Sequence, residues 1–116
     1  MPLLRIVTSA SAAADGRVPL LSELSRFVAE KLRKPESYVM TSLVTNATMT
    51  FAGSTEPACS VELKNIGSFT PKETRDLSAE LCKRLEAALG VPAARIYIEF
   101  TNAQGHLWGH DGETFG

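Results

Sequence analysis

Apolar and polar positions along the 116-residue chain form blocks with the spacing of strands and helices. Leu3–Thr8 and Tyr38–Thr45 are short runs of apolar and β-branched residues, which favour buried strands. Apolar and polar residues alternate through Cys59–Ile66, as in a strand with one exposed face. Arg95–Thr101 again concentrates strand-forming residues. The pattern therefore predicts four strands.

The first predicted helix follows the turn signal Asp15-Gly16 and begins at Pro19, since proline is well tolerated in a first helical turn. It ends near Arg33, because Pro35 disfavours helical geometry in the residue before it. The spacing of its apolar residues predicts an amphipathic helix. Those residues are Leu20, Leu21, Leu24, Phe27, Val28 and Leu32.

The second predicted helix has the clearest start in the chain. Thr70-Pro71-Lys72-Glu73 has the form of a capping box with proline at the first helical position. Gly90 favours a left-handed stop at the other end. The apolar stripe between them consists of Leu77, Leu81, Cys82, Leu85 and Leu89. Together with the strands, this gives the order strand–helix–strand twice, an α+β arrangement.

The two halves form a weak internal repeat, because each joins its helix to the next strand through a proline, Pro35 in one half and Pro92 in the other. We expect two βαβ units side by side in one four-stranded mixed sheet, with both helices on one face. The second face and the edges would then be uncovered, and oligomerisation is the expected remedy. Apolar strand residues expected on that second face include Met40, Leu43, Ile96 and Ile98.

Composition narrows the class of protein. The length and the 44% hydrophobic content suit one compact domain spanning residues 1–116. The formal net charge is −1 with no basic block, so we expect no nucleic-acid partner. No run approaches the ~18 apolar residues that would span a bilayer, so no membrane partner is expected. A secretory signal pattern is lacking, and Cys59 and Cys82 suit free thiols in a reducing compartment, so the expected location is cytoplasmic.

His106 and His110 are the first candidates for chemistry, as metal ligands. They lie four residues apart in a glycine-bearing tail rather than on a helix, and no cysteine or third histidine joins them. We therefore expect no metal. The chain also lacks a nucleophile elbow, a phosphate loop and a dinucleotide fingerprint, and no cofactor is expected.

Pro2 is a different kind of candidate. Methionine is readily trimmed before a small residue, so we expect a mature chain that begins with the secondary amine of Pro2. At the head of a strand, proline holds this amine with one fixed dihedral. An ordinary terminal amine has a pKa of about 7.7–8, which an apolar pocket or a nearby cation lowers. Such a base can remove a proton adjacent to a carbonyl. Proline after methionine is nevertheless common and usually idle.

Further segments, in order and at compatible spacing, strengthen this candidate. They are Met1-Pro2, Leu21–Leu24, Lys34–Val39, Met49–Pro57, Asn65–Gly67, Arg95–Ile98 and Thr114-Phe115. Each is weak alone, but together they are specific and extend over nearly the whole chain. In these segments the sequence resembles the macrophage migration inhibitory factor family of the tautomerase superfamily, and in particular its microbial members.

The resemblance implies a homotrimer that pairs the exposed strand edges, with active sites between subunits and Pro2 at the floor of each. It also implies a cofactor-independent tautomerase that moves a proton between the α-carbon and the carbonyl oxygen of arylpyruvate-type keto acids such as phenylpyruvate. Lys34, assisted by the backbone of Ile66, would hold the carboxylate of this small-molecule keto acid. Three aromatic residues would form the walls of the pocket, namely Tyr38, Tyr97 and Phe115. Of these, Tyr97 would come from the neighbouring subunit.

Two positions depart from the family pattern. Glu99 stands where many members have an asparagine that helps to recognise the far end of a hydroxyaryl substrate. His110 stands where the family tail has a tryptophan, and Trp108 precedes the glycine instead, so we expect a wider, more polar and pH-sensitive pocket mouth. The substrate therefore stays open, and so do decarboxylation and dehalogenation, which the superfamily also performs.

Functions of another class stay open as well. Animal members act as cytokines, so the alternative is a signalling or host-modulating protein that binds a receptor. Such a protein would be released without a signal peptide, and its pocket would be vestigial or secondary. By residue type alone, the preferred interpretation is that Lys34 is a solvated helix-end cation and that the aromatic residues belong to the core.

Overall fold

The computed structural model describes residues 1–116, and its elements follow the predicted order. The main elements are β1 (Leu3–Thr8), α1 (Ala14–Leu32), β2 (Met40–Val44), β3 (Cys59–Ile66), α2 (Pro71–Leu89) and β4 (Ile96–Ala103). The tail forms a short hairpin of β5 (Gly109–His110) and β6 (Glu113–Thr114). Three 3-10 turns lie between these elements, namely η1 (Glu36–Tyr38), η2 (Ala93–Arg95) and η3 (Gly105–Leu107).

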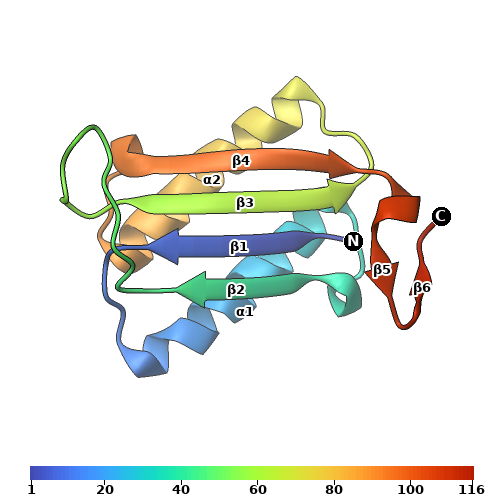
Figure 1. The fold of residues 1–116 in the computed structure, drawn as a ribbon, viewed down its shortest axis with the longest axis horizontal. Coiled ribbons are helices and arrows are strands. Elements are labelled where there is room, and N and C mark those ends of the chain that lie inside the picture. Colours follow the sequence, from blue (N-terminus) through green and yellow to red (C-terminus); the bar gives the residue numbers. More distant parts are fainter.

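The first four strands form one sheet in the order β2-β1-β3-β4. Within each half the strands pair in parallel, β1 with β2 and β3 with β4, while β1 and β3 pair antiparallel where the halves meet. Both long helices lie across the same face of this sheet (Figure 1). The prediction of two βαβ units in a four-stranded mixed sheet is confirmed, with β2 and β4 as its open edges.

The core lies between that face of the sheet and the two helices. Alternation in β1 and β3 turns Leu4, Ile6, Val61 and Leu63 toward the helices, where each is at most 1% exposed. The helix α2 contributes its stripe at four-residue spacing, because residues that far apart share one helix face. Its buried members are Leu77, Leu81, Leu85 and Leu89. Neither long helix has the uninterrupted apolar length that a bilayer crossing requires.

The capping box predicted for α2 is confirmed. Thr70 Oγ1 accepts a hydrogen bond from the Glu73 amide at 3.1 Å, and the Thr70 amide donates to Glu73 Oε1 at 3.2 Å. Gly90 ends the helix in the left-handed region with a φ of 70°, which glycine adopts without steric cost. Local signals alone therefore fix both ends of this helix.

The prediction for α1 is wrong at its start. The helix begins at Ala14, so the Asp15-Gly16 turn signal lies inside its first turn, and Pro19 lies inside the helix. The Gly16 amide donates to the Ala13 carbonyl at 2.9 Å, which starts the helical hydrogen bonding before the proline. The carboxylate of Asp15 suits the positive end of the helix, and Pro19, as the sixth helical residue, cannot donate the backbone hydrogen bond to the Asp15 carbonyl.

The prediction for the uncovered face of the sheet is wrong at three of four positions. Ile96 is 7% exposed and belongs to the core, and Leu43 and Ile98 pack against that core. Met40, as expected, is 66% exposed. Register explains the difference, because Ile98 lies beside the buried Val61 and so shares its helix-covered face.

Pro35 and Pro92 have the same backbone role in the two halves, as the weak repeat predicts. Each precedes a 3-10 turn, η1 or η2, and an edge strand follows the turn. Tyr38 and Arg95 therefore lie in these turns rather than in the strands that were predicted to begin with them. The turn takes Tyr38 out of the alternation of β2 and leaves its side chain beside the N-terminal end of β1.

Candidate active site

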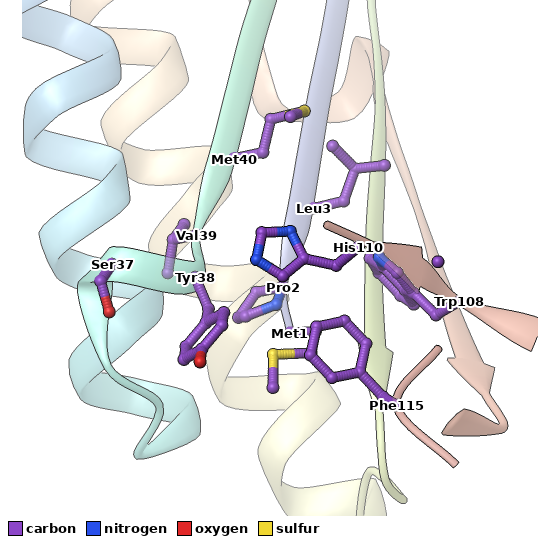
Figure 2. Close-up of a pocket in the computed structure, with 11 residues that line it drawn as sticks. Met1, Pro2, Leu3, Ser37, Tyr38, Val39, Met40, Trp108, His110 and Phe115 are labelled. Carbon is purple, nitrogen blue, oxygen red and sulfur yellow. The ribbon is translucent and has the colours of Figure 1, made fainter. Parts of the chain in front are cut away.

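A pocket of about 220 Å³ lies where the N-terminal end of β1, the turn η1 and the tail hairpin meet (Figure 2). Seven of its 11 lining residues are hydrophobic. The residues that matter most below are Met1, Pro2, Tyr38, Trp108, His110 and Phe115. Four of the residues that the sequence predicted for the site, Pro2 and three aromatic residues, thus lie around one cavity.

Pro2 is fully buried at the floor of this pocket, immediately before β1. Its carbonyl accepts a hydrogen bond from the Met40 amide at 3.1 Å, which ties the start of β1 to β2. Met1 is still present, and its amine donates to Asn65 Oδ1 at 3.4 Å. Partial burial, and then the positive charge of Lys34, hold the pKa of this terminal amine below its ordinary value of 8.0.

Lys34 is positioned by the end of α1. Arg33 adopts the left-handed conformation, its amide bonds to the Glu30 carbonyl, and the Lys34 amide bonds to the Ala29 carbonyl at 3.0 Å. This closing turn sends the side chain toward the end of β3, where Lys34 Nζ donates to the Ile66 carbonyl at 3.4 Å. The pair that the sequence predicted as the carboxylate site is thus brought together near the terminal amine.

Three rings from separate segments form the aromatic wall. Tyr38 and Phe115 meet edge to face at 6.0 Å between centroids. The imidazole of His110 stacks on Phe115 at 5.6 Å with an interplanar angle of 6°, and it meets Tyr38 at 5.9 Å. The Phe115 amide donates to the carbonyls of Gly105 and Trp108 at 3.2 Å each, and these bonds hold the C-terminal residues against η3. The wall is therefore built by tertiary contacts between η1 and the tail.

Tyr97 and Glu99 do not reach the pocket of their own chain. Both lie on the uncovered face of β4, and Tyr97 is 70% exposed. The ring of Tyr97 packs edge to face on Phe51 at 4.9 Å, and the Arg95 guanidinium holds that loop by donating to the carbonyls of Phe51, Ser54, Glu56 and Pro57. Tyr97 and Glu99 thus lie on a separate surface of the chain.

Sequence reasoning missed Asn65 and Met40 as site residues, and it placed His110 at the pocket mouth only through the family resemblance. A local signal for Asn65 exists, because alternation in β3 puts this polar residue on the buried face, where it is 4% exposed. Met40 offers no such signal, since it enters the pocket through the pairing of β2 with β1. No cluster of three or more His, Cys, Asp or Glu side chains that could hold a metal ion is present.

An apolar cavity with a buried strand-leading proline, a terminal amine of lowered pKa and an adjacent lysine suits proton transfer on a small anionic molecule. Known proteins resemble this chain in sequence and in fold. The family model described as macrophage migration inhibitory factor (MIF) matches residues 1–116.

Similar proteins cover almost the full length of the chain. A macrophage migration inhibitory factor homolog from Trichinella spiralis is 39% identical over 115 residues, which are 99% of this chain and 100% of the relative. The crystal structure of a homologue from Prochlorococcus marinus is 49% identical, with a TM-score of 0.94 over 98% of this chain and 99% of that one. The solved Trichinella spiralis structure is 38% identical, with a TM-score of 0.89 over 97% and 99%. The chain belongs to the macrophage migration inhibitory factor family.

Proposed function

We propose that the protein is a cofactor-independent keto–enol tautomerase acting on arylpyruvate-type keto acids, with Pro2 as the general base. The observation that carries this proposal is the position of Pro2, buried at the floor of an aromatic pocket beside an amine whose pKa burial and Lys34 lower. Loss of Met1 would place the amine on Pro2 itself, deeper in the same pocket. A base with a pKa near the working pH is the most effective one for proton transfer.

The reaction needs only a proton relay between two atoms of the substrate. The neutral Pro2 amine takes a proton from the carbon next to the carbonyl, and the electrons of that C–H bond form the enol double bond. The carbonyl π electrons move to the oxygen, which receives the proton back from the protonated amine. Lys34 holds the substrate carboxylate, and its charge, like burial, favours the neutral form of an amine at this chain end. The rings of Tyr38 and Phe115 flank the aryl group.

We also propose that the working unit is a homotrimer with sites between subunits. The open strand edges, together with exposed Tyr97, Met40 and Val44 on the uncovered face, support an assembly that covers them. Tyr97 is 70% exposed and outside its own chain's pocket, so a neighbouring subunit's pocket is a suitable place for it. The family resemblance supports the same arrangement.

The test of this function is an ultraviolet assay of phenylpyruvate. The purified protein, with Met1 removed, should accelerate the interconversion of the keto and enol forms without any added metal or cofactor. Folded protein that shows no acceleration with any aryl keto acid tested would overturn the proposal.

Replacement of Lys34 by methionine should weaken substrate binding and shift the pH profile together. The KM for phenylpyruvate should rise by about 10- to 100-fold, because a hydrogen-bonded charge contact to the carboxylate is lost. Loss of the cation also raises the pKa of the terminal amine, so the acid limb of kcat/KM should move to higher pH. Both effects are read from initial rates across pH.

The matched control is Lys31→Met, which removes a cation from the last turn of the same helix that does not act on the terminal amine as Lys34 does. It should leave KM and the acid limb unchanged. A Lys34→Met protein with the KM and pH profile of the unchanged protein would contradict the assigned role.

A further inference from the structure

His110 lines the pocket, yet the proposed proton transfer gives it no part. Its ring is fixed by the stacked contact with Phe115 at 5.6 Å, and the strand β5 that carries it is paired with β6. Stacking uses the face of the imidazole and leaves free the in-plane directions along which its nitrogens donate and accept hydrogen bonds. The His110 ring is therefore held in place on a pocket wall, and its nitrogens can form hydrogen bonds there.

Its position along the pocket indicates which part of a ligand it meets. The carboxylate end of the site is at Lys34 and Ile66, which meet near the terminal amine, and Pro2 lies at the floor. His110 is instead an exposed part of the pocket wall, as is Tyr38, which is 43% exposed. An aryl ring that contacts Phe115 in the proposed function would lie within reach of the imidazole, because the imidazole stacks on the same ring.

We propose that His110 is a specificity-determining residue that hydrogen-bonds a polar group at the ring end of an aryl keto acid, favouring hydroxyaryl over unsubstituted substrates. The inference rests on the proposed function, because it concerns the same pocket and substrate class. Glu99, which the family resemblance implies for this task, lies on the uncovered face of β4, outside the pocket of its own chain. The pocket of one chain also contains the hydroxyls of Ser37 and Tyr38 and the Trp108 indole, and among these polar groups the imidazole is the one that stacks in parallel on Phe115.

The experiment compares phenylpyruvate with 4-hydroxyphenylpyruvate in the full chain and four variants, one of which is Glu99→Gln. His110→Phe keeps a ring to stack on Phe115 but removes the hydrogen-bonding nitrogens, and His110→Gln restores an amide in their place. The control His106→Phe changes the other histidine, which lies in η3 outside the pocket. His110→Phe should lower the kcat/KM preference for the hydroxylated substrate by about three- to tenfold, mainly through KM.

His110→Gln should recover most of that preference, and His106→Phe should leave it unchanged. The proposal is overturned if His110→Phe leaves the preference intact, if His106→Phe lowers it equally, or if only Glu99→Gln lowers it. Binding of 3-phenylpropanoate and 3-(4-hydroxyphenyl)propanoate, followed by NMR titration, separates this question from catalysis. A binding preference that depends on His110, found without any turnover, would overturn the proposed function but support this inference. Turnover without a preference that depends on His110 would support the proposed function but overturn this inference. Absence of that preference in both assays overturns the inference.

Discussion

Pro2→Gly should lower kcat/KM for phenylpyruvate by up to about 10²- to 10⁴-fold, the full contribution of a positioned general base. Glycine is also small, so Met1 should still be removed and an amine should still stand at the chain end. The loss comes from the ring. Pro2 is fully buried and its fixed φ points the nitrogen in one direction, whereas a glycine amine rotates freely and leaves the floor of the pocket unfilled.

The matched control is Pro19→Gly, which changes an exposed proline inside α1 that does not line the pocket. Its kcat/KM should equal that of the unchanged protein, and circular dichroism should show that both variants are folded. Full activity in a folded Pro2→Gly protein would remove Pro2 from the mechanism.

Leu63→Ala should have the largest effect on stability, lowering the free energy of unfolding by about 2–5 kcal/mol. Leu63 is 0% exposed on β3, and it lies between Leu4 of β1 and Phe100 of β4 in the sheet register. A cavity there faces paired strands on both sides, which limits collapse of the surroundings into the space. Urea denaturation followed by circular dichroism measures the change.

Leu107→Ala serves as the comparison, because Leu107 is 72% exposed in η3. It should change the free energy of unfolding by no more than about 0.5 kcal/mol. If the two variants were equally stable, the core described above would not be the main source of stability.

The elements that sequence predicted best are those fixed by neighbouring residues. The helix α2 carries its start signal at Thr70 and Glu73 and its stop at Gly90, and β3 carries a strict alternation. The errors arise where distant contacts decide. Ile96 and Ile98 reveal their face only through pairing with β3, and Tyr38 leaves the strand because a 3-10 turn follows Pro35.

The site divides in the same way. Residue types alone singled out Pro2 only weakly, and the family resemblance brought Lys34, Ile66, Tyr38 and Phe115 to it. The structure places Tyr38 and Phe115 in the pocket wall and the Lys34–Ile66 pair near the terminal amine, outside the pocket lining. No spacing rule could have placed them there, because α1, β3 and the tail approach one another only in the folded chain. Tyr97 and Glu99 lie elsewhere, and their part stays a prediction that depends on a neighbouring subunit.

The two cysteines are weakly reactive, and this makes a direct chemical test of Pro2 feasible. Burial, and then the neighbouring Cys82, raise the pKa of the Cys59 thiol to about 12, and partial burial raises that of Cys82. Thiolates, which are the reactive form, are therefore scarce near neutral pH. A neutral terminal amine in the pocket should be the fastest nucleophile toward a small keto acid that carries a leaving group.

The decisive measurement is the intact mass of the protein, followed by peptide mapping, after brief exposure to 3-bromopyruvate. The amine nitrogen would form a bond to the halogen-bearing carbon, and bromide would leave. We predict a chain without Met1 that gains one adduct, mapped to Pro2, with matching loss of activity and protection by phenylpyruvate. Retention of Met1, or inactivation with the adduct on Cys59, Cys82 or a lysine while Pro2 stays unmodified, would contradict the assignment of Pro2 as the base.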